Sequence, residues 1–295
     1  MGYSWSQQDE TVGAGFKRIA TEQIAKAVHN ADAVNDPPAR RIHAARRHCK
    51  RLRGLFRLVR SDFPDYRPAN AAVRDAAAIL STVRDATVLR QTLERLYSWT
   101  GYPLAKAHRH ETDHAELEAA ALMSFRRRMA MLLGEAEGWT IKKIDVSTLG
   151  RGYERCYGRA VKTAERCRDK PTDDLFHDWR KLVKYHSFHL ILLKSCLGEG
   201  VREEIEKVEH LAGLLGRHHD LAVLRHVVRT EPEKLGGELD TAFVDAHAAL
   251  LQDHLGARAF VLSGEIFARP PRIARGSLEA RWHAWWHSAP VEEPA

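Results

Sequence analysis

The chain of 295 residues is 44% hydrophobic and carries 46 Lys and Arg against 39 Asp and Glu, a net charge of +7 at pH 7. This length allows one large domain or two of ordinary size, and the absence of any run near the ~20 apolar residues that cross a bilayer excludes a helical membrane protein. The first residues lack the basic-then-apolar order of a signal peptide, so we expect a cytoplasmic protein.

Helical periodicity dominates from about residue 10 to the end of the chain, and no stretch alternates as a β-strand does. Clusters of Pro, Gly and Asp predict turns, which fall at 35–38, 63–68, 100–103, 137–139, 169–174, 197–200, 231–237 and 269–272. These breaks leave eight substantial helices and a short C-terminal helix at 275–287. The sequence therefore predicts an all-α fold.

The stretch 40–60 is the most basic part of the chain, with nine Arg and Lys residues and no acidic residue. Apolar residues recur along it at steps of three and four, from Ile42 to Val59, and form one face of the predicted helix. A narrow basic stripe lies beside this face and consists of His43, Arg46, Lys50, Arg53 and Arg57. Arg40, Arg47 and Arg51 fall further round the helix, and we expect them to face solvent.

A stripe of cations without acidic neighbours predicts an anionic ligand. A helix that needs charge only for solubility usually interleaves the signs, because like charges at i, i+4 cost about 0.2–0.5 kcal/mol each. Arg offers paired donors to phosphate oxygens, and Lys adds a mobile point charge. The alternative is that long basic side chains merely cover the flanks of the helix and reach water.

The basic stretch has a counterpart later in the chain. "IHAARRHCK" (42–50) aligns with "FHDWRKLVK" (176–184) at an offset of 134 residues, and "LSTVRDATVLR" (80–90) aligns with "LGRHHDLAVLR" (215–225) at an offset of 135. Two matches in the same order predict two related four-helix units, over about 10–137 and 145–270. Short connections favour antiparallel neighbours within each unit.

The second copy supplies candidate anion ligands of its own. Its stripe consists of His177, Arg180, Lys181 and Lys184. Ser187 and Ile191 stand where the first copy has Arg53 and Arg57, so we expect a lopsided surface to which the first unit contributes more. An anion near the two stripe histidines would raise their pKa values, which predicts stronger binding in mild acid.

Further basic positions extend the candidate site. The fifth predicted helix has a basic face formed by Arg151, Arg155, Arg159 and Lys162. Lys17, on the first helix, aligns with Arg151 at the same offset of 134 residues. The cluster Arg126–Arg128 has no counterpart in the repeat, and both a ligand site and a solvated surface stay open for it.

Two acidic residues and the four cysteines are assigned structural roles. Asp85 and Asp220 align in the repeat, and we expect them to cap turns or to orient the basic stripes. The cysteines form no CxxC pair and lie within helical patterns, which predicts buried free thiols in a reducing compartment; they are Cys49, Cys156, Cys167 and Cys196.

These motifs together resemble the CHAD domain, the conserved histidine α-helical domain. The resemblance rests on "HAARRHCKRLR" from His43 and its echo "HDWRKLVK" from His177, with "TVRDATVLR", "GRHHDLAVLR", "RGYERCYGRAVKTA" (151–164), "FARPPR" and "RWHAWW". It covers about residues 10–287, and we expect residues 1–287 to form a single such domain. Nothing in the chain resembles the CYTH triphosphate-hydrolysing domain to which some members of the family are fused.

The resemblance implies a fold and a ligand. The fold would be two four-helix bundles related by pseudo-two-fold symmetry, with a basic surface at their junction that binds inorganic polyphosphate. We therefore expect a non-catalytic polyphosphate-binding protein without metal or cofactor, which lies in the cytoplasm and, as some members do, on polyphosphate granules. The expected ligand residues are Lys17, His43, Arg46, Arg47, Lys50, Arg51, Arg53, Arg57, Arg151, Arg155, Arg159, Lys162, His177, Arg180, Lys181 and Lys184.

Other functions stay open as alternatives. "RHHD" at 217–220 permits a metal-dependent phosphohydrolase, although Arg84 takes the place of His219 in the first unit. A basic groove also attracts nucleic acid, although the basic helices lack zinc-finger spacing and the interleaved aromatic residues that stack on bases. A scaffold that binds an acidic protein is a third alternative.

Overall fold

The structure is a computed structural model that describes residues 2–81, 85–101, 115–235 and 239–288. Every regular element within these ranges is helical, so the predicted all-α class is confirmed. The ten α-helices there are α1 (Val12–Asp32), α2 (Pro38–Leu58), α3 (Tyr66–Ile79), α4 (Asp85–Thr100), α5 (Ala115–Glu135), α6 (Val146–Asp169), α7 (Asp173–Leu197), α8 (Val201–Thr230), α9 (Thr241–Ile266) and α10 (Pro271–Trp286). Two short 3-10 helices follow α5 and α8, at Ala136–Gly138 and Pro232–Leu235.

Local signals in the sequence determine where several helices begin. The side chains of Thr11, Asp145 and Asp240 accept hydrogen bonds from backbone N–H groups in the first turns of α1, α6 and α9. Pro38 and Pro271 begin α2 and α10, where a missing N–H group leaves no helical hydrogen bond unmade. The predicted turns therefore lie close to the observed ones, and α10 begins four residues before its predicted start.

One helix differs from its prediction. The predicted breaks left a single helix between residues 68 and 100, whereas α3 ends at Ile79 and α4 begins at Asp85. No Pro or Gly lies at this break, where Ser81, Thr82 and Val83 supply only weak helix propensity. The aligned stretch of the second half, 215–225, lies inside the unbroken helix α8.

The same comparison corrects the role assigned to Asp220. This residue lies in the middle of α8, so it caps no turn, and that part of the prediction is wrong. The side chain of its counterpart Asp85 lies outside the described residues. All four cysteines are buried free thiols, as predicted.

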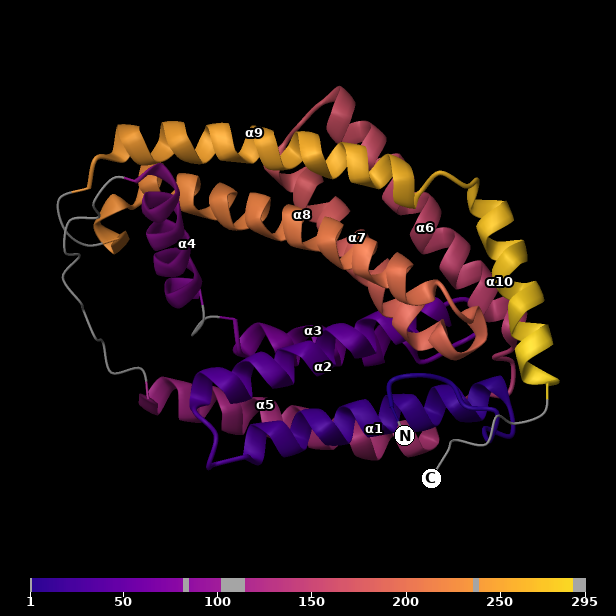
Figure 1. The fold of residues 1–295 in the computed structure, drawn as a ribbon. Helices are drawn as coiled ribbons and strands as arrows, with labels where there is room; N and C mark the ends of the chain where they lie inside the picture. The colour runs from indigo at the N-terminus through magenta and orange to yellow at the C-terminus, as the bar shows by residue number, and fades with distance from the viewer. Residues whose placement is uncertain (1, 82–84, 102–114, 236–238, 289–295) are drawn as a thin grey trace.

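The helices form two groups by their contacts (Figure 1), and one continuous cluster of buried hydrophobic residues runs through both. The first group contains α1, α2, α3 and α5, and the second contains α6, α7, α8 and α9, with α10 packed on α6 and α7. Helix α4 leaves the first group and packs against α8 and α9. The second half of the predicted third helix therefore belongs to the other half of the fold. Within the described ranges, no helix is long and apolar enough to span a bilayer.

Aromatic side chains pack together within each group. In the first group four rings contact one another, with every pair of centroids between 4.9 and 6.2 Å apart: Phe16, Phe56, Phe63 and Trp139. In the second group Trp179 of α7 stacks on Phe260 of α9, with 5.2 Å between their centroids. Aromatic pairs at these distances add to the free energy gained by burying their surface.

Helices α2 and α7 contact each other where the two groups meet. Gly54 lies directly against Phe188, because a Cβ added at Gly54 would stand 3.0 Å from the Cβ of Phe188. The buried His189 donates a hydrogen bond from Nε2 to the carbonyl oxygen of Gly54, 3.0 Å away. Positions 54 and 188 differ by the repeat offset of 134, so the two basic helices meet at equivalent points.

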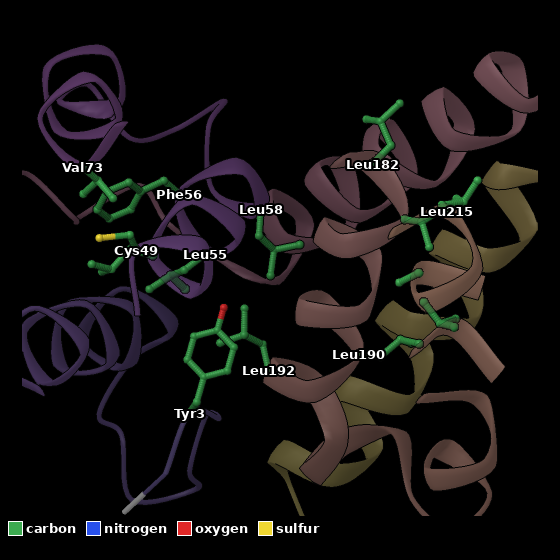
Figure 2. Packing of buried hydrophobic residues seen from close by; sticks show 14 of the residues in the cluster. Tyr3, Cys49, Leu55, Phe56, Leu58, Val73, Leu182, Leu190, Leu192 and Leu215 are labelled. Carbon is green, nitrogen blue, oxygen red and sulfur yellow. The ribbon is translucent and has the colours of Figure 1, made fainter. Parts of the chain in front are cut away.

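The N-terminal segment covers this junction (Figure 2). The Tyr3 hydroxyl donates a hydrogen bond of 2.7 Å to the carbonyl of Arg51 on α2, and the Tyr3 ring meets Phe188 of α7 edge-on. The backbone N–H of Trp5 donates to the carbonyl of Leu192, 3.4 Å away. Figure 2 shows the Tyr3 ring beside Leu192, between the two helices. This segment therefore ties α2 to α7.

A pair of glycine substitutions tests the packing of α6 on α2. In Gly152→Ala the new Cβ would lie 1.8 Å from the carbonyl oxygen of Leu58, so α6 has to move away from the end of α2. We expect a loss of about 1–3 kcal/mol in the free energy of unfolding, as overpacking typically causes. Urea denaturation measures this loss.

The matched control is Gly276→Ala in the middle of α10, where an added Cβ meets nothing within 4 Å. We expect this variant to gain about 0.5–1 kcal/mol, because Ala loses less backbone entropy than Gly on folding. Equal stability of the two variants would contradict the close approach of α6 and α2.

Candidate functional site

The basic stripe of α2 lies along α3, whose polar groups orient it. Arg46 donates a hydrogen bond to the hydroxyl of Ser81, just after the end of α3. Arg53 and Arg57 both donate to the side-chain oxygen of Asn70, at 3.5 and 3.1 Å. Three guanidinium groups of the stripe are therefore held in fixed directions before any ligand binds.

Arg57 lies at the junction of three helices. Its guanidinium carbon stands 4.0 Å from the centroid of the Tyr185 ring on α7, and burial lowers the pKa of Arg57. Burial raises the pKa of the Cys156 thiol of α6 to about 12, and the nearby charges of Arg57 and Arg159 oppose this rise. Because both cations act on one thiol, positive charge continues from the α2 stripe onto α6.

The basic stripe of α7 lies beside α8. A Cβ added at Gly216 of α8 would stand 3.7 Å from the Nε of Arg180, which places this guanidinium against α8. Lys184 is partly buried. Its pKa is lowered mainly by burial and to a smaller extent by the charge of Arg180. Lys181 is exposed and forms an ion pair of 3.0 Å with Asp178. The four predicted positions of the α7 stripe thus follow one side of the helix.

Two histidines face each other between α7 and α8. The ring centroids of His177 and His219 lie 4.3 Å apart, and the Nδ1 atom of His177 is buried without a hydrogen-bond partner among the described residues. Burial lowers both pKa values to about 4, helped at His177 by His219 and at His219 by Arg180. Both rings are therefore neutral at pH 7, and an anion beside them would raise their pKa values.

Three arginines of α2 stand outside the ion pairs of the described residues. Arg53 and Arg57 form no ion pair with a carboxylate in the described part of the chain, and Arg47 stands exposed without one. His43 and Lys50 of the same stripe are also exposed. The expectation that these cations of α2 and α7 form an anion-binding surface stays a prediction.

Two predicted ligand residues are engaged in contacts between segments. Lys17 donates a hydrogen bond of 2.6 Å to the carbonyl of Glu137, which ties α1 to the 3-10 helix after α5. Arg151 forms an ion pair of 2.6 Å with Asp62 and so links α6 to the segment after α2. These two equivalent positions of the repeat both hold the fold together.

Arg51 lies elsewhere than predicted. Its guanidinium carbon is 5.1 Å from the centroid of the Tyr3 ring, and the side chain is partly buried instead of facing solvent. The prediction is wrong because the N-terminal segment folds over this side of α2, and a helical wheel contains no information about so distant a contact. Arg40 and Arg47 are exposed, as predicted.

The remaining basic positions lie on helix surfaces. Arg155, Arg159 and Lys162 are exposed on one side of α6. All three arginines of the α5 cluster are exposed, and Arg126 forms an ion pair of 2.6 Å with Asp32.

The sequence "RHHD" does not assemble a metal site within the described part of the chain. His218 stacks on Phe176, with 3.9 Å between the ring centroids, whereas His219 faces His177. No group of three or more His, Cys, Asp or Glu residues that could hold a metal ion occurs among the described residues.

Two residues beside the α2 stripe were not predicted from the sequence. Asn70 holds Arg53 and Arg57, and Tyr185 stacks under Arg57. Asn70 is a polar residue in the otherwise Ala-rich stretch "PANAAV", which is the one local feature that marks it. Nothing local distinguishes Tyr185 from a core residue, because its role depends on a helix more than a hundred residues away.

Comparison with protein families matches residues 18–229 to the CHAD domain. The match extends from α1 to the last turn of α8 and includes both basic helices. No curated protein and no solved structure matches the chain.

The pair of histidines gives a prediction for the protein without ligand. NMR titration should show a pKa near 4 for both His177 and His219, below the usual value of about 6.5. In His219→Gln the pKa of His177 should rise, because a second positive charge no longer opposes its protonation, while burial keeps it below the usual value. A His177 ring that titrates near 6.5 in the unmodified protein would contradict the burial of this pair.

Proposed function

The chain belongs to the CHAD-domain family, and from that premise we propose that it binds inorganic polyphosphate without hydrolysing it. The observation that carries the proposal is the contact between the basic helices α2 and α7, together with three arginines of α2 that form no ion pair with a carboxylate among the described residues: Arg47, Arg53 and Arg57. Polyphosphate offers dense charge without bases or sugars, which suits a surface made of Arg, Lys and His.

The arrangement of the stripes supports an extended ligand. Cations at steps of three and four stand about 5–6 Å apart along a helix, so successive phosphates can contact successive side chains. Asn70 and Ser81 hold three guanidiniums of α2 in place, which reduces the entropy lost on binding. We further propose that the two halves are related by a pseudo-two-fold axis near Gly54 and Phe188.

The alternatives differ from this proposal in chemistry. A metal-dependent phosphohydrolase needs ligands for its metal, and His218 and His219, the adjacent candidates, face different neighbours. Nucleic acid and acidic proteins share the negative charge of polyphosphate but also present bases or side chains. Localisation on polyphosphate granules is part of the proposal, because it follows from binding.

Competition between two polyanions tests the ligand class. Long-chain polyphosphate should bind. The logarithm of its binding constant should fall linearly with the logarithm of the salt concentration, because each neutralised phosphate releases counterions. DNA of matched charge should compete poorly at each ionic strength, as fluorescence anisotropy with labelled polyphosphate would show.

Equal competition by DNA would refute specific recognition of polyphosphate. The same samples, incubated with Mg²⁺ or Mn²⁺, should release no phosphate from polyphosphate or tripolyphosphate. Turnover that depends on the metal would replace the binding proposal with the phosphohydrolase.

Charge removal tests which surface binds. Lys50→Ala and Lys181→Ala each remove an exposed cation from one stripe, so the fold should tolerate them. Each should weaken polyphosphate binding. Each should also reduce the slope of log K against log salt by about 0.7 per lost phosphate contact, the value for single-stranded nucleic acids. Titrations across a salt series measure both effects.

The matched control is Arg127→Ala, which removes an exposed cation from α5. It should leave the affinity and the salt slope close to those of the unmodified protein. If all three variants lose affinity equally, the stripes have no special role and net charge alone attracts the ligand.

A further inference from the structure

A pocket lies where α4 packs against α8 and α9, and no residue of either stripe lines it. Its volume of about 360 Å³ falls within the range of small-molecule sites, about 300–1,000 Å³. Four leucines give it an apolar lining: Leu96, Leu221, Leu251 and Leu255. Such a lining favours a ligand that has an apolar or aromatic part.

Three guanidinium groups border this pocket, and each comes from a different helix. Arg95 belongs to α4, Arg217 to α8 and Arg258 to α9. None of the three forms an ion pair with a carboxylate in the described part of the chain. His254 adds an imidazole, and Asp220 is the acidic residue of the described lining. The excess of positive charge favours phosphate oxygens, which guanidinium groups bind in pairs.

An exposed indole stands at the same pocket. Trp99 lines it and is 67% exposed. It follows Arg95 by four residues in α4, so the two side chains project from the same side of the helix. A large aromatic ring beside a pocket offers a stacking surface for a flat ligand, such as a base.

We propose that this pocket binds a nucleoside di- or triphosphate. The base stacks on Trp99 above the apolar lining, and the phosphates contact Arg95, Arg217 and Arg258. Inorganic polyphosphate would use the arginines and leave the indole and the leucines without a partner, so the pocket discriminates between the two ligands. This proposal does not rest on polyphosphate binding by the stripes.

Three probes separate the parts of the ligand. ADP should bind at least about tenfold more tightly than pyrophosphate, which lacks the base, and than adenosine, which lacks the phosphates. Isothermal titration calorimetry measures the affinities. Quenching of tryptophan fluorescence on addition of ADP reports contact with an indole, and this quenching should disappear in Trp99→Leu.

Substitution of a residue that contacts the base should affect ADP binding alone, whereas substitution of a residue that contacts the phosphates should affect both ADP and pyrophosphate. Trp99→Leu should lose about tenfold in ADP affinity and little in pyrophosphate affinity. Arg217→Ala and Arg258→Ala should each weaken ADP and pyrophosphate by about tenfold or more. Thermal unfolding of each variant shows whether α4 stays packed on α8 and α9.

Lys50→Ala is the control, because it removes one exposed cation from the α2 stripe and should leave ADP binding unchanged. ADP binding that falls in Lys50→Ala and persists in Arg217→Ala would assign the nucleotide to the stripes and overturn the proposal. ADP affinity no greater than that of pyrophosphate would overturn it as well, whatever the outcome for polyphosphate.

Discussion

The close approach of α2 and α7 at Gly54 and Phe188 determines how the two basic stripes lie relative to each other. Without a Cβ at Gly54, the two backbones come near enough for the buried His189 to donate a hydrogen bond to the Gly54 carbonyl. Burial lowers the pKa of His189 to about 4, so this imidazole stays neutral at pH 7 inside the core. Arg57 then stacks on Tyr185 close to this contact, and the charge of one helix reaches the next.

The fold can tolerate a surface of unneutralised cations because the opposite side of the same helices is well buried. Four large apolar side chains of α2 are fully buried: Leu52, Leu55, Phe56 and Leu58. Each contributes about 1.5–3 kcal/mol by leaving water, whereas a like-charge pair at i, i+4 costs about 0.2–0.5 kcal/mol. The burial of the apolar face therefore outweighs the repulsion, and α2 is stable although it contains no acidic residue.

Features encoded by neighbouring residues were predictable from the sequence, and features created by distant contacts were not. Pro, Gly and Asp clusters gave most helix ends, and the apolar periodicity gave the buried side of α2. The burial of Arg51 was missed because Tyr3 reaches it from the N-terminal segment. Asn70 was missed for the same reason, since its two arginine partners come from another helix. The break between α3 and α4 was missed because no strong helix breaker lies there.

The break between α3 and α4 also creates the pocket between α4, α8 and α9. In the second half of the chain, the aligned stretch 215–225 lies in the middle of the unbroken helix α8. Both ends of α8 therefore belong to the same group of helices. In the first half, α4 separates from α3 and packs on α8 and α9, which brings Arg95 and Trp99 next to Arg217 and Arg258. Two copies with the same continuous helix would not place these residues together. The two basic stripes lie on stretches that align between the two halves of the chain. The pocket, in contrast, depends on the break between α3 and α4, which the second half lacks.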